Sequence, residues 1–202
     1  MLFKINSKYK SQGVIMKYKT IKLGLLLASL CGLASAANIA EVAKTGPGNT
    51  ATAGAGKEWP TTRFVVSGDC VTDKLTGLMW AKDANLFGLK KWQDTSANPN
   101  TYPAQEAIDA MNTNSGATGY HLCGYSDWRL PKQKELLSLF NYANANQATW
   151  LISAGFSNVR SYYYWSSTPG GNGAWGVNMN SGLSGSLDVT LNYYVWPVRG
   201  GQ

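Results

Sequence analysis

Charged residues are scarce in this sequence, at 14% of the chain against roughly 25% in an average globular protein. Asn, Ser, Thr and Gly therefore carry most of the polar surface. Histidine is scarcer still, because His121 is the only one in 202 residues. A His-based metal cluster is excluded, and any Ser-His-Asp catalytic set would have to use His121. We expect a structural histidine and no enzymatic activity, although any two of the 11 acidic residues could meet in space as a catalytic pair.

A hydrophobic run long enough to cross a membrane is also missing. Residues 23–33 form an apolar run that is shorter than the roughly 20 residues a transmembrane helix needs. A basic stretch at residues 16–22 precedes the run, and the small-x-small sequence Ala34-Ser35-Ala36 follows it. That order is typical of a secretory signal peptide. We predict a signal peptide at residues 1–36 and no stable transmembrane anchor; translation could start at Met1 or at Met16.

A basic surface is missing once the signal peptide is removed. Residues 1–36 contain six of the 18 basic residues and none of the 11 acidic ones, so the remaining chain has a net charge of +1. Its basic residues are scattered along the sequence. Proteins that bind nucleic acid usually show a clustered basic face, so we expect no nucleic-acid partner.

Cysteine is limited to three residues, and one of them, Cys31, lies in the predicted signal peptide. An even pair in an exported chain predicts a disulfide between Cys70 and Cys123. Two independent buried thiols, or half of a metal site, are the alternative. Neither cysteine has the CxxC or CxH spacing of zinc ligands, so we assign no metal site.

The composition changes sharply near Trp59. Residues 38–57 have no aromatic residue and are rich in Ala, Gly, Thr and Lys, which is typical of a flexible segment. All eight tryptophans follow, from Trp59 to Trp196. We predict a linker at residues 37–58 and one domain at residues 59–202, a normal domain size.

The pattern within this domain predicts an α+β fold. Pro103 is suited to the first turn of a helix that ends near Gly116, and Pro131 opens a second helix. Short runs of β-type residues precede and follow these two helices. The expected strands are residues 63–66, 77–81, 162–167, 174–179, 185–189 and 193–199.

Four segments in a fixed order, at residues 70–80, 124–131, 164–168 and 195–201, resemble the C-terminal domain family of bacterial collagen-like adhesins, the Lcl C-terminal domain. The resemblance implies a C-type-lectin-like domain with two helices beside a mainly antiparallel sheet, in which the first and last strands pair. It also implies a trimer that binds sulfated glycosaminoglycans. This sequence has no Gly-X-Y repeat before the domain.

Large aromatic residues in these segments are usually part of the core. We expect Trp128 to fill the core, and Asp127 and Arg129 to satisfy one another or nearby backbone, although a charge pair around an aromatic ring also suits a functional site. The residues that we assign a structural role are Trp80, Asp127, Trp128, Arg129, Trp165 and Arg199.

The loops at residues 168–173 and 180–186 are the expected ligand-binding region. Aromatic faces stack on sugar rings, and short amides bind sugar hydroxyls without the desolvation cost of a charge. A variable loop without a ligand is the alternative. The candidate ligand-binding residues are Tyr162, Tyr163, Asn172, Asn178, Asn180, Tyr193 and Tyr194. A sulfated ligand would instead use basic residues, namely Arg129, Lys132, Lys134 and Arg160.

We therefore expect an adhesin-like recognition domain without catalysis, located in the periplasm, at the cell surface or in the medium. The expected partner is carbohydrate or another extracellular polymer. A structural or assembly subunit that binds another surface protein through its aromatic β surface is the alternative. No cofactor is expected, and a calcium site is left unassigned, although several aspartates could supply oxygen ligands: Asp69, Asp73, Asp83 and Asp127.

Overall fold

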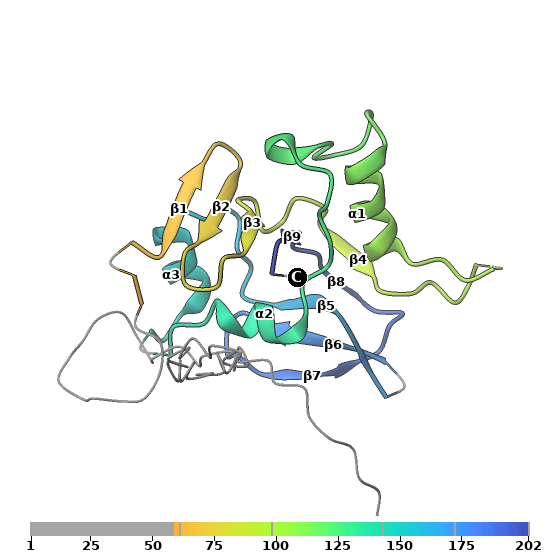
Figure 1. Cartoon of the computed structure of the whole chain (residues 1–202). Coiled ribbons are helices and arrows are strands. Elements are labelled where there is room, and N and C mark those ends of the chain that lie inside the picture. Colours follow the sequence, from red (N-terminus) through yellow and green to blue (C-terminus); the bar gives the residue numbers. More distant parts are fainter. Residues whose placement is uncertain (1–58, 61, 98, 143, 172, 202) are drawn as a thin grey trace, which may run out of the picture. The chain divides into compact units, whose positions relative to one another are not determined.

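The computed structural model describes residues 59–60, 62–97, 99–142, 144–171 and 173–201. These residues form an α+β domain with two mainly antiparallel sheets, where the sequence predicted one (Figure 1). The predicted signal peptide and linker lie outside the described residues. No described helix is long and apolar enough to cross a membrane.

The first sheet has the order β1-β2-β3-β9. Each neighbouring pair is antiparallel, and the isolated bridge between Arg129 and Val198 extends the sheet beyond β9. The implied pairing of the first and last strands is wrong, because β2 and β3 lie between β1 and β9. The C-type-lectin-like arrangement stays a prediction. The bounds are β1 Phe64–Ser67, β2 Cys70–Asp73, β3 Met79–Ala81 and β9 Val198–Arg199.

The second sheet has the order β4-β8-β5-β6-β7, and its β5–β8 pair is parallel. The Leu187 side chain of β7 lies over Gly176 of β6, where an added Cβ would collide with it. The bounds are β4 Leu89–Lys91, β5 Tyr163–Gly170, β6 Gly173–Asn178, β7 Ser184–Leu187 and β8 Asn192–Tyr194.

The predicted single strand at residues 193–199 is wrong, because β8 and β9 belong to different sheets. The residues between them are buried and cross from one sheet to the other. The Trp196 indole donates to the Ala81 carbonyl at 2.7 Å, and the Pro197 carbonyl accepts from the Ala81 N–H at 3.1 Å. These two bonds to Ala81 carry the chain from the end of β8 at Tyr194 to the first sheet, where β9 begins at Val198.

The described residues contain three α-helices, where the sequence predicted two. The first begins at Pro103, as predicted. The second begins two residues after Pro131, because Lys132 is extended and its N–H donates to the Glu135 carboxylate at 2.6 Å. The third was missed in the sequence. The bounds are α1 Pro103–Thr113, α2 Gln133–Ser138 and α3 Gln147–Ser153, with a 3₁₀ turn at Leu122–Gly124.

Two clusters of buried residues form the core. In one, Trp196 lies between Trp80 and Phe156, with edge-to-face ring contacts at 5.4 and 5.1 Å. In the other, α1 packs Ile108 and Met111 against the second sheet. Each fully buried large side chain contributes about 1.5–3 kcal/mol to the free energy of folding, so these rings fix how the sheets pack.

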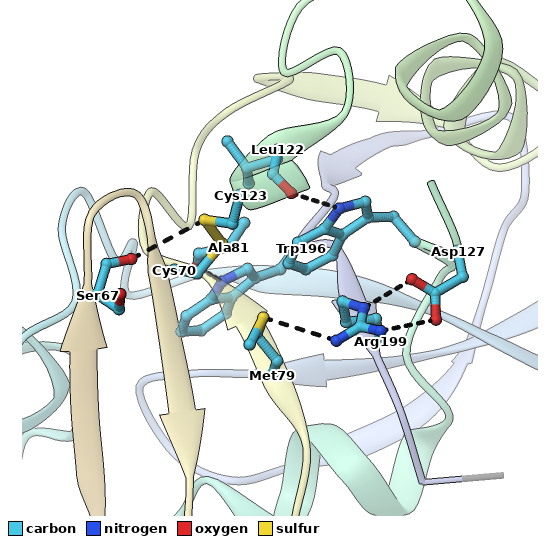
Figure 2. Close-up of a disulfide and its surroundings, with 10 residues drawn as sticks. Ser67, Cys70, Met79, Ala81, Leu122, Cys123, Asp127, Trp196 and Arg199 are labelled. Carbon is cyan, nitrogen blue, oxygen red and sulfur yellow. Dashed lines mark hydrogen bonds and ion pairs between the residues drawn. A yellow bond between two sulfur atoms is a disulfide. The ribbon is translucent and has the colours of Figure 1, made fainter. Parts of the chain in front are cut away.

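The predicted disulfide between Cys70 and Cys123 is confirmed, across 53 positions of sequence. It joins the start of β2 to the 3₁₀ turn (Figure 2). Cys70 is buried and Cys123 is exposed. The bond therefore ties the segment after α1 to the first sheet.

Candidate functional site

The tryptophans of the predicted structural motif all lie in the core. Trp80, Trp128 and Trp165 are buried. The Trp128 indole donates to the Leu122 carbonyl at 3.2 Å, and the Trp165 indole donates to the Lys90 carbonyl at 2.8 Å. None of the three offers a ring face to a ligand.

The charges of the same motif form two separate ion pairs, so the expected pairing of Asp127 with Arg129 is wrong. Arg129 binds both oxygens of Glu135, at 2.8 and 2.7 Å, and the Gly200 carbonyl at 2.7 Å. It also donates to the Leu130 carbonyl at 3.2 Å, as the backbone alternative predicted. Because the segment is extended, residues 127 and 129 are about 6–7 Å apart, and each meets an opposite charge from another element.

Asp127 pairs instead with Arg199 of β9, at 2.6 and 3.1 Å (Figure 2). Hydrogen bonding to this guanidinium lowers the pKa of Asp127 below its usual value. The guanidinium also lies 3.6 Å from the centre of the Tyr125 ring, where a cation–π contact is favourable. Arg129 and Arg199 thus hold the last strand in place.

The four candidate tyrosines lie together where β5 and β8 meet, but they differ in exposure. Tyr193 is 9% exposed, and its ring packs 4.9 Å from Trp165 and 5.4 Å from Tyr163. Tyr194 is half-buried against Tyr164 at 5.4 Å. Tyr162 is 48% exposed. We leave Tyr193 out of the candidate site, because its ring faces are covered by the core.

The turn between β6 and β7 lies directly beside Tyr162. The Met179 N–H donates to the Tyr162 carbonyl at 2.9 Å. Asn178 fixes the turn, because its side-chain oxygen accepts the Asn180 N–H at 2.9 Å and its carbonyl accepts the Gly182 N–H at 2.9 Å. The Asn178 side-chain oxygen is therefore engaged within the turn, whereas the exposed Asn180 amide makes no side-chain hydrogen bond to the described residues.

Two exposed side chains that sequence reasoning missed complete this surface. Tyr142 is 63% exposed, and its ring stacks on Phe140 at 5.8 Å. Both rings pack against Gly182, where an added Cβ would lie 3.2–3.6 Å from them. Leu183 follows in the chain and is 65% exposed. We call Tyr142, Tyr162, Asn180 and Leu183 the turn surface.

The other predicted loop, at residues 168–173, is mostly strand. β5 continues to Gly170 and β6 begins at Gly173, so the hairpin loop is much shorter than expected. The Ser186 hydroxyl of β7 donates to the Gly170 carbonyl at 2.5 Å, which fixes the end of β5. Asn172 lies outside the described residues.

The basic residues proposed to bind a sulfated ligand differ in exposure and in ion pairing. Arg129 is committed to Glu135, whereas the other three are exposed, namely Lys132, Lys134 and Arg160. The Arg160 N–H donates to the Tyr164 hydroxyl at 2.8 Å.

The candidate calcium ligands do not converge. Asp73 is paired with Arg63, and Asp83 accepts from Asn158 at 3.0 Å and from the Asn85 N–H at 2.8 Å. Within the described residues, no group of three or more His, Cys, Asp and Glu side chains could hold a metal ion. The His121 ring nitrogen lies 3.0 Å from the Asn112 carbonyl, and the ring stacks on Tyr120.

A family model described as the Lcl C-terminal domain matches residues 69–199, which is more than half of the chain. No curated protein matches the chain. The matched range includes both cysteines, the two ion pairs and the turn surface.

Proposed function

Since the chain belongs to the Lcl C-terminal domain family, we propose that it is an exported recognition domain without catalysis, which binds carbohydrate or another extracellular polymer. The family indicates a surface or extracellular domain. The signal-peptide pattern at residues 1–36 and the Cys70–Cys123 disulfide support export, because structural disulfides persist in oxidising compartments.

The observation that carries the proposal is the turn surface. Its two tyrosines and one leucine are among the most exposed large hydrophobic residues of the described part of the chain. Exposed apolar side chains that gather at one place mark interaction sites more often than single ones do. Here Tyr142 packs against a turn that contains Leu183 and the exposed Asn180 amide and is fixed by its own hydrogen bonds, and the Tyr162 backbone is bonded to the same turn.

The chemistry of this surface suits a neutral polymer. Tyrosine rings stack on the apolar faces of sugars, and an amide forms hydrogen bonds with hydroxyls. No Lys or Arg belongs to the surface. A rigid sheet that presents such a turn needs little reordering on binding, which favours affinity.

The test is a glycan array followed by affinity measurements on the strongest hit. Tyr142→Ala and Asn180→Ala should each raise the Kd about fivefold, since an aromatic contact or a hydrogen bond is worth about 1 kcal/mol. The melting temperature should change little. Tyr120→Ala is the matched control, because Tyr120 is also exposed but lies in the segment after α1.

Three results would contradict the assignment of a neutral polymer to the turn surface. If Tyr142→Ala and Asn180→Ala bind as tightly as the parent, the turn surface does not carry the function. If only variants of Lys132, Lys134 and Arg160 lose affinity for the polymer, and high salt abolishes binding, the ligand is the sulfated polymer that the family resemblance implies. A silent array together with a stable oligomer would support the assembly-subunit alternative.

A further inference from the structure

A second candidate site lies beside α1, apart from the turn surface. The described residues form a surface pocket of about 260 Å³ between α1, β5, the residue that follows β4 and the segment that precedes α2. Figure 1 shows α1 alongside β4. The pocket is lined by Trp92, Tyr102, Gln105, Glu106, Asp109, Leu130 and Ser167.

Two aromatic rings form a fixed wall of this pocket. The Trp92 indole donates to the Ser166 carbonyl at 3.0 Å, which holds its ring in place. The Tyr102 ring packs edge-to-face against it, with centroids 5.8 Å apart and an interplanar angle of 84°. Tyr102 is nevertheless 42% exposed. The wall is therefore both rigid and open to a ligand.

Two carboxylates from α1 face the same pocket. Glu106 and Asp109 are three residues apart, so they share one face of the helix. One Glu106 oxygen accepts the Tyr102 N–H at 2.9 Å, and one Asp109 oxygen accepts the Gln105 amide at 2.9 Å. Neither carboxylate forms an ion pair with a described Lys or Arg, and none of the lining residues is basic.

Aromatic rings and uncompensated carboxylates together select a cation. A ligand cation within about 6 Å of a Trp or Tyr ring is attracted by the ring's π electrons, and a carboxylate binds an ammonium through charge-assisted hydrogen bonds. A sulfated or other anionic ligand would be repelled. The pocket thus differs in charge from any site formed by Lys132, Lys134 and Arg160.

The remaining polar groups favour a sugar over an aliphatic amine. The Gln105 amide and the Ser167 hydroxyl line the pocket with the carboxylates. They match the hydroxyl groups of a pyranose ring, which the methylene chain of lysine lacks. Trp92 and Tyr102 match the ring's C–H face.

We propose that this pocket binds an amino sugar with a free ammonium group, such as a glucosamine unit of a de-N-acetylated polysaccharide. The ammonium lies between Glu106 and Asp109, and the sugar ring packs against Trp92 and Tyr102. This proposal does not depend on the turn surface, so the two can fail separately.

Isothermal titration calorimetry on the full chain tests the proposal with a glucosamine tetramer that carries free amines. Its N-acetylated counterpart should bind at least about tenfold more weakly, because the charge-assisted hydrogen bonds are lost. The double variant Glu106→Gln, Asp109→Asn should lower the affinity for the free-amine tetramer by a similar factor. High salt should weaken the same complex.

Asp69→Asn is the matched control, because it removes an exposed carboxylate from the β1–β2 turn and should leave the affinity unchanged. Equal binding of the two tetramers, or full affinity in the double variant, would overturn the proposal. Tetralysine that binds as tightly as the glucosamine tetramer would overturn it too, since the pocket would then recognise an alkylammonium group and not a sugar.

Discussion

At the scale of single residues, the pair formed by Arg63 and Asp73 is the most deeply buried ion pair of the described residues. The side chains are 4% and 0% exposed, and the two hydrogen bonds between them are 2.9 and 2.7 Å long. Asp73 also accepts the Leu75 N–H and the Thr76 hydroxyl, both at 2.9 Å. These four contacts engage both oxygens of the Asp73 carboxylate with Arg63 and the β2–β3 turn, so we assign Asp73 no role as a metal ligand.

Removing one partner of this pair should destabilise the domain strongly. Asp73→Ala should lower the free energy of unfolding by about 3–5 kcal/mol, because it leaves the Arg63 charge buried and unpaired. Urea denaturation measures this. The double variant Arg63→Met, Asp73→Ala should lose less than the sum of the two single variants.

Asp94→Asn is a control for the general effect of removing a carboxylate, since its partner Lys91 lies on the surface and surface pairs contribute little. An Asp73→Ala variant as stable as the parent would show that the Arg63–Asp73 pair contributes nothing net to folding.

At the scale of elements, Tyr164 connects β5 to the rest of the second sheet and to the core. Its hydroxyl accepts the Arg160 N–H, and its ring contacts Tyr194 of β8 and Trp196, at 5.4 and 5.5 Å. Burial raises the pKa of the Tyr164 phenol above its usual value, and burial also raises the pKa of Tyr193. The two phenols are therefore held neutral by the packing of β5 against β8.

This packing predicts a loss of stability at alkaline pH. The pKa of Tyr164 in the folded state lies above the unfolded value of about 10, so the folded state retains the proton that the unfolded state releases. The stabilisation is complete below pH 10 or so and is lost as the pH rises above it. Denaturation at a series of pH values, with phenolate absorbance as a second signal, measures the effect.

Tyr164→Phe provides the comparison. It should cost about 1 kcal/mol at neutral pH, because the Arg160 N–H loses its acceptor, but its stability should fall less steeply above pH 10. If the free energy of unfolding of the variant falls with pH as steeply as that of the parent, the loss of stability at alkaline pH is due to groups other than Tyr164.

The sequence predicted best those elements in which the spacing of apolar residues and the residue at the start are typical of a helix or strand. α1 has a proline at its start and buries Ala104, Ile108 and Met111 on one face, so its period is visible in the sequence. α3 buries Gln147, Ala148 and Leu151. Because Gln147 is polar, the spacing of apolar residues expected of an amphipathic helix is not visible in the sequence of α3. Gln147 is buried because its side chain forms hydrogen bonds with the Asn141 backbone.

At the scale of the whole molecule, the candidate site could be predicted only in part. The sequence places Asn180 in the turn itself, and an antiparallel pairing of the strands expected at residues 162–167 and 174–179 brings Tyr162 next to the start of that turn. Tyr142 is far away in sequence and reaches the turn only through its packing with Phe140 on Gly182. The sequence predicts a strand at Tyr193, but it does not show which face of that strand points into the core, because this depends on how the strands are ordered.

Long-range links also hold the molecule together as a unit. The Cys70–Cys123 bond ties the segment after α1 to β2. The Arg129–Glu135 and Asp127–Arg199 pairs then fix the same segment to α2 and to β9. Within the described residues, these three ties join the segment to the first sheet at β2 and β9 and to α2, and only the disulfide is covalent.

Breaking the disulfide should destabilise this arrangement without abolishing it. In the chain-entropy model, a loop of this length contributes about 4 kcal/mol, and each kcal/mol shifts the melting temperature by about 2–4 °C in a domain of this size. The double variant Cys70→Ala, Cys123→Ala should therefore melt about 10 °C lower than the parent, and dithiothreitol should have the same effect on the parent but none on the variant. Asp69→Asn is the control, because it changes an exposed residue next to Cys70 and leaves the bond in place. If the double variant melts at the parent's temperature, the two ion pairs and the core suffice to order the segment, and the disulfide contributes no net stability.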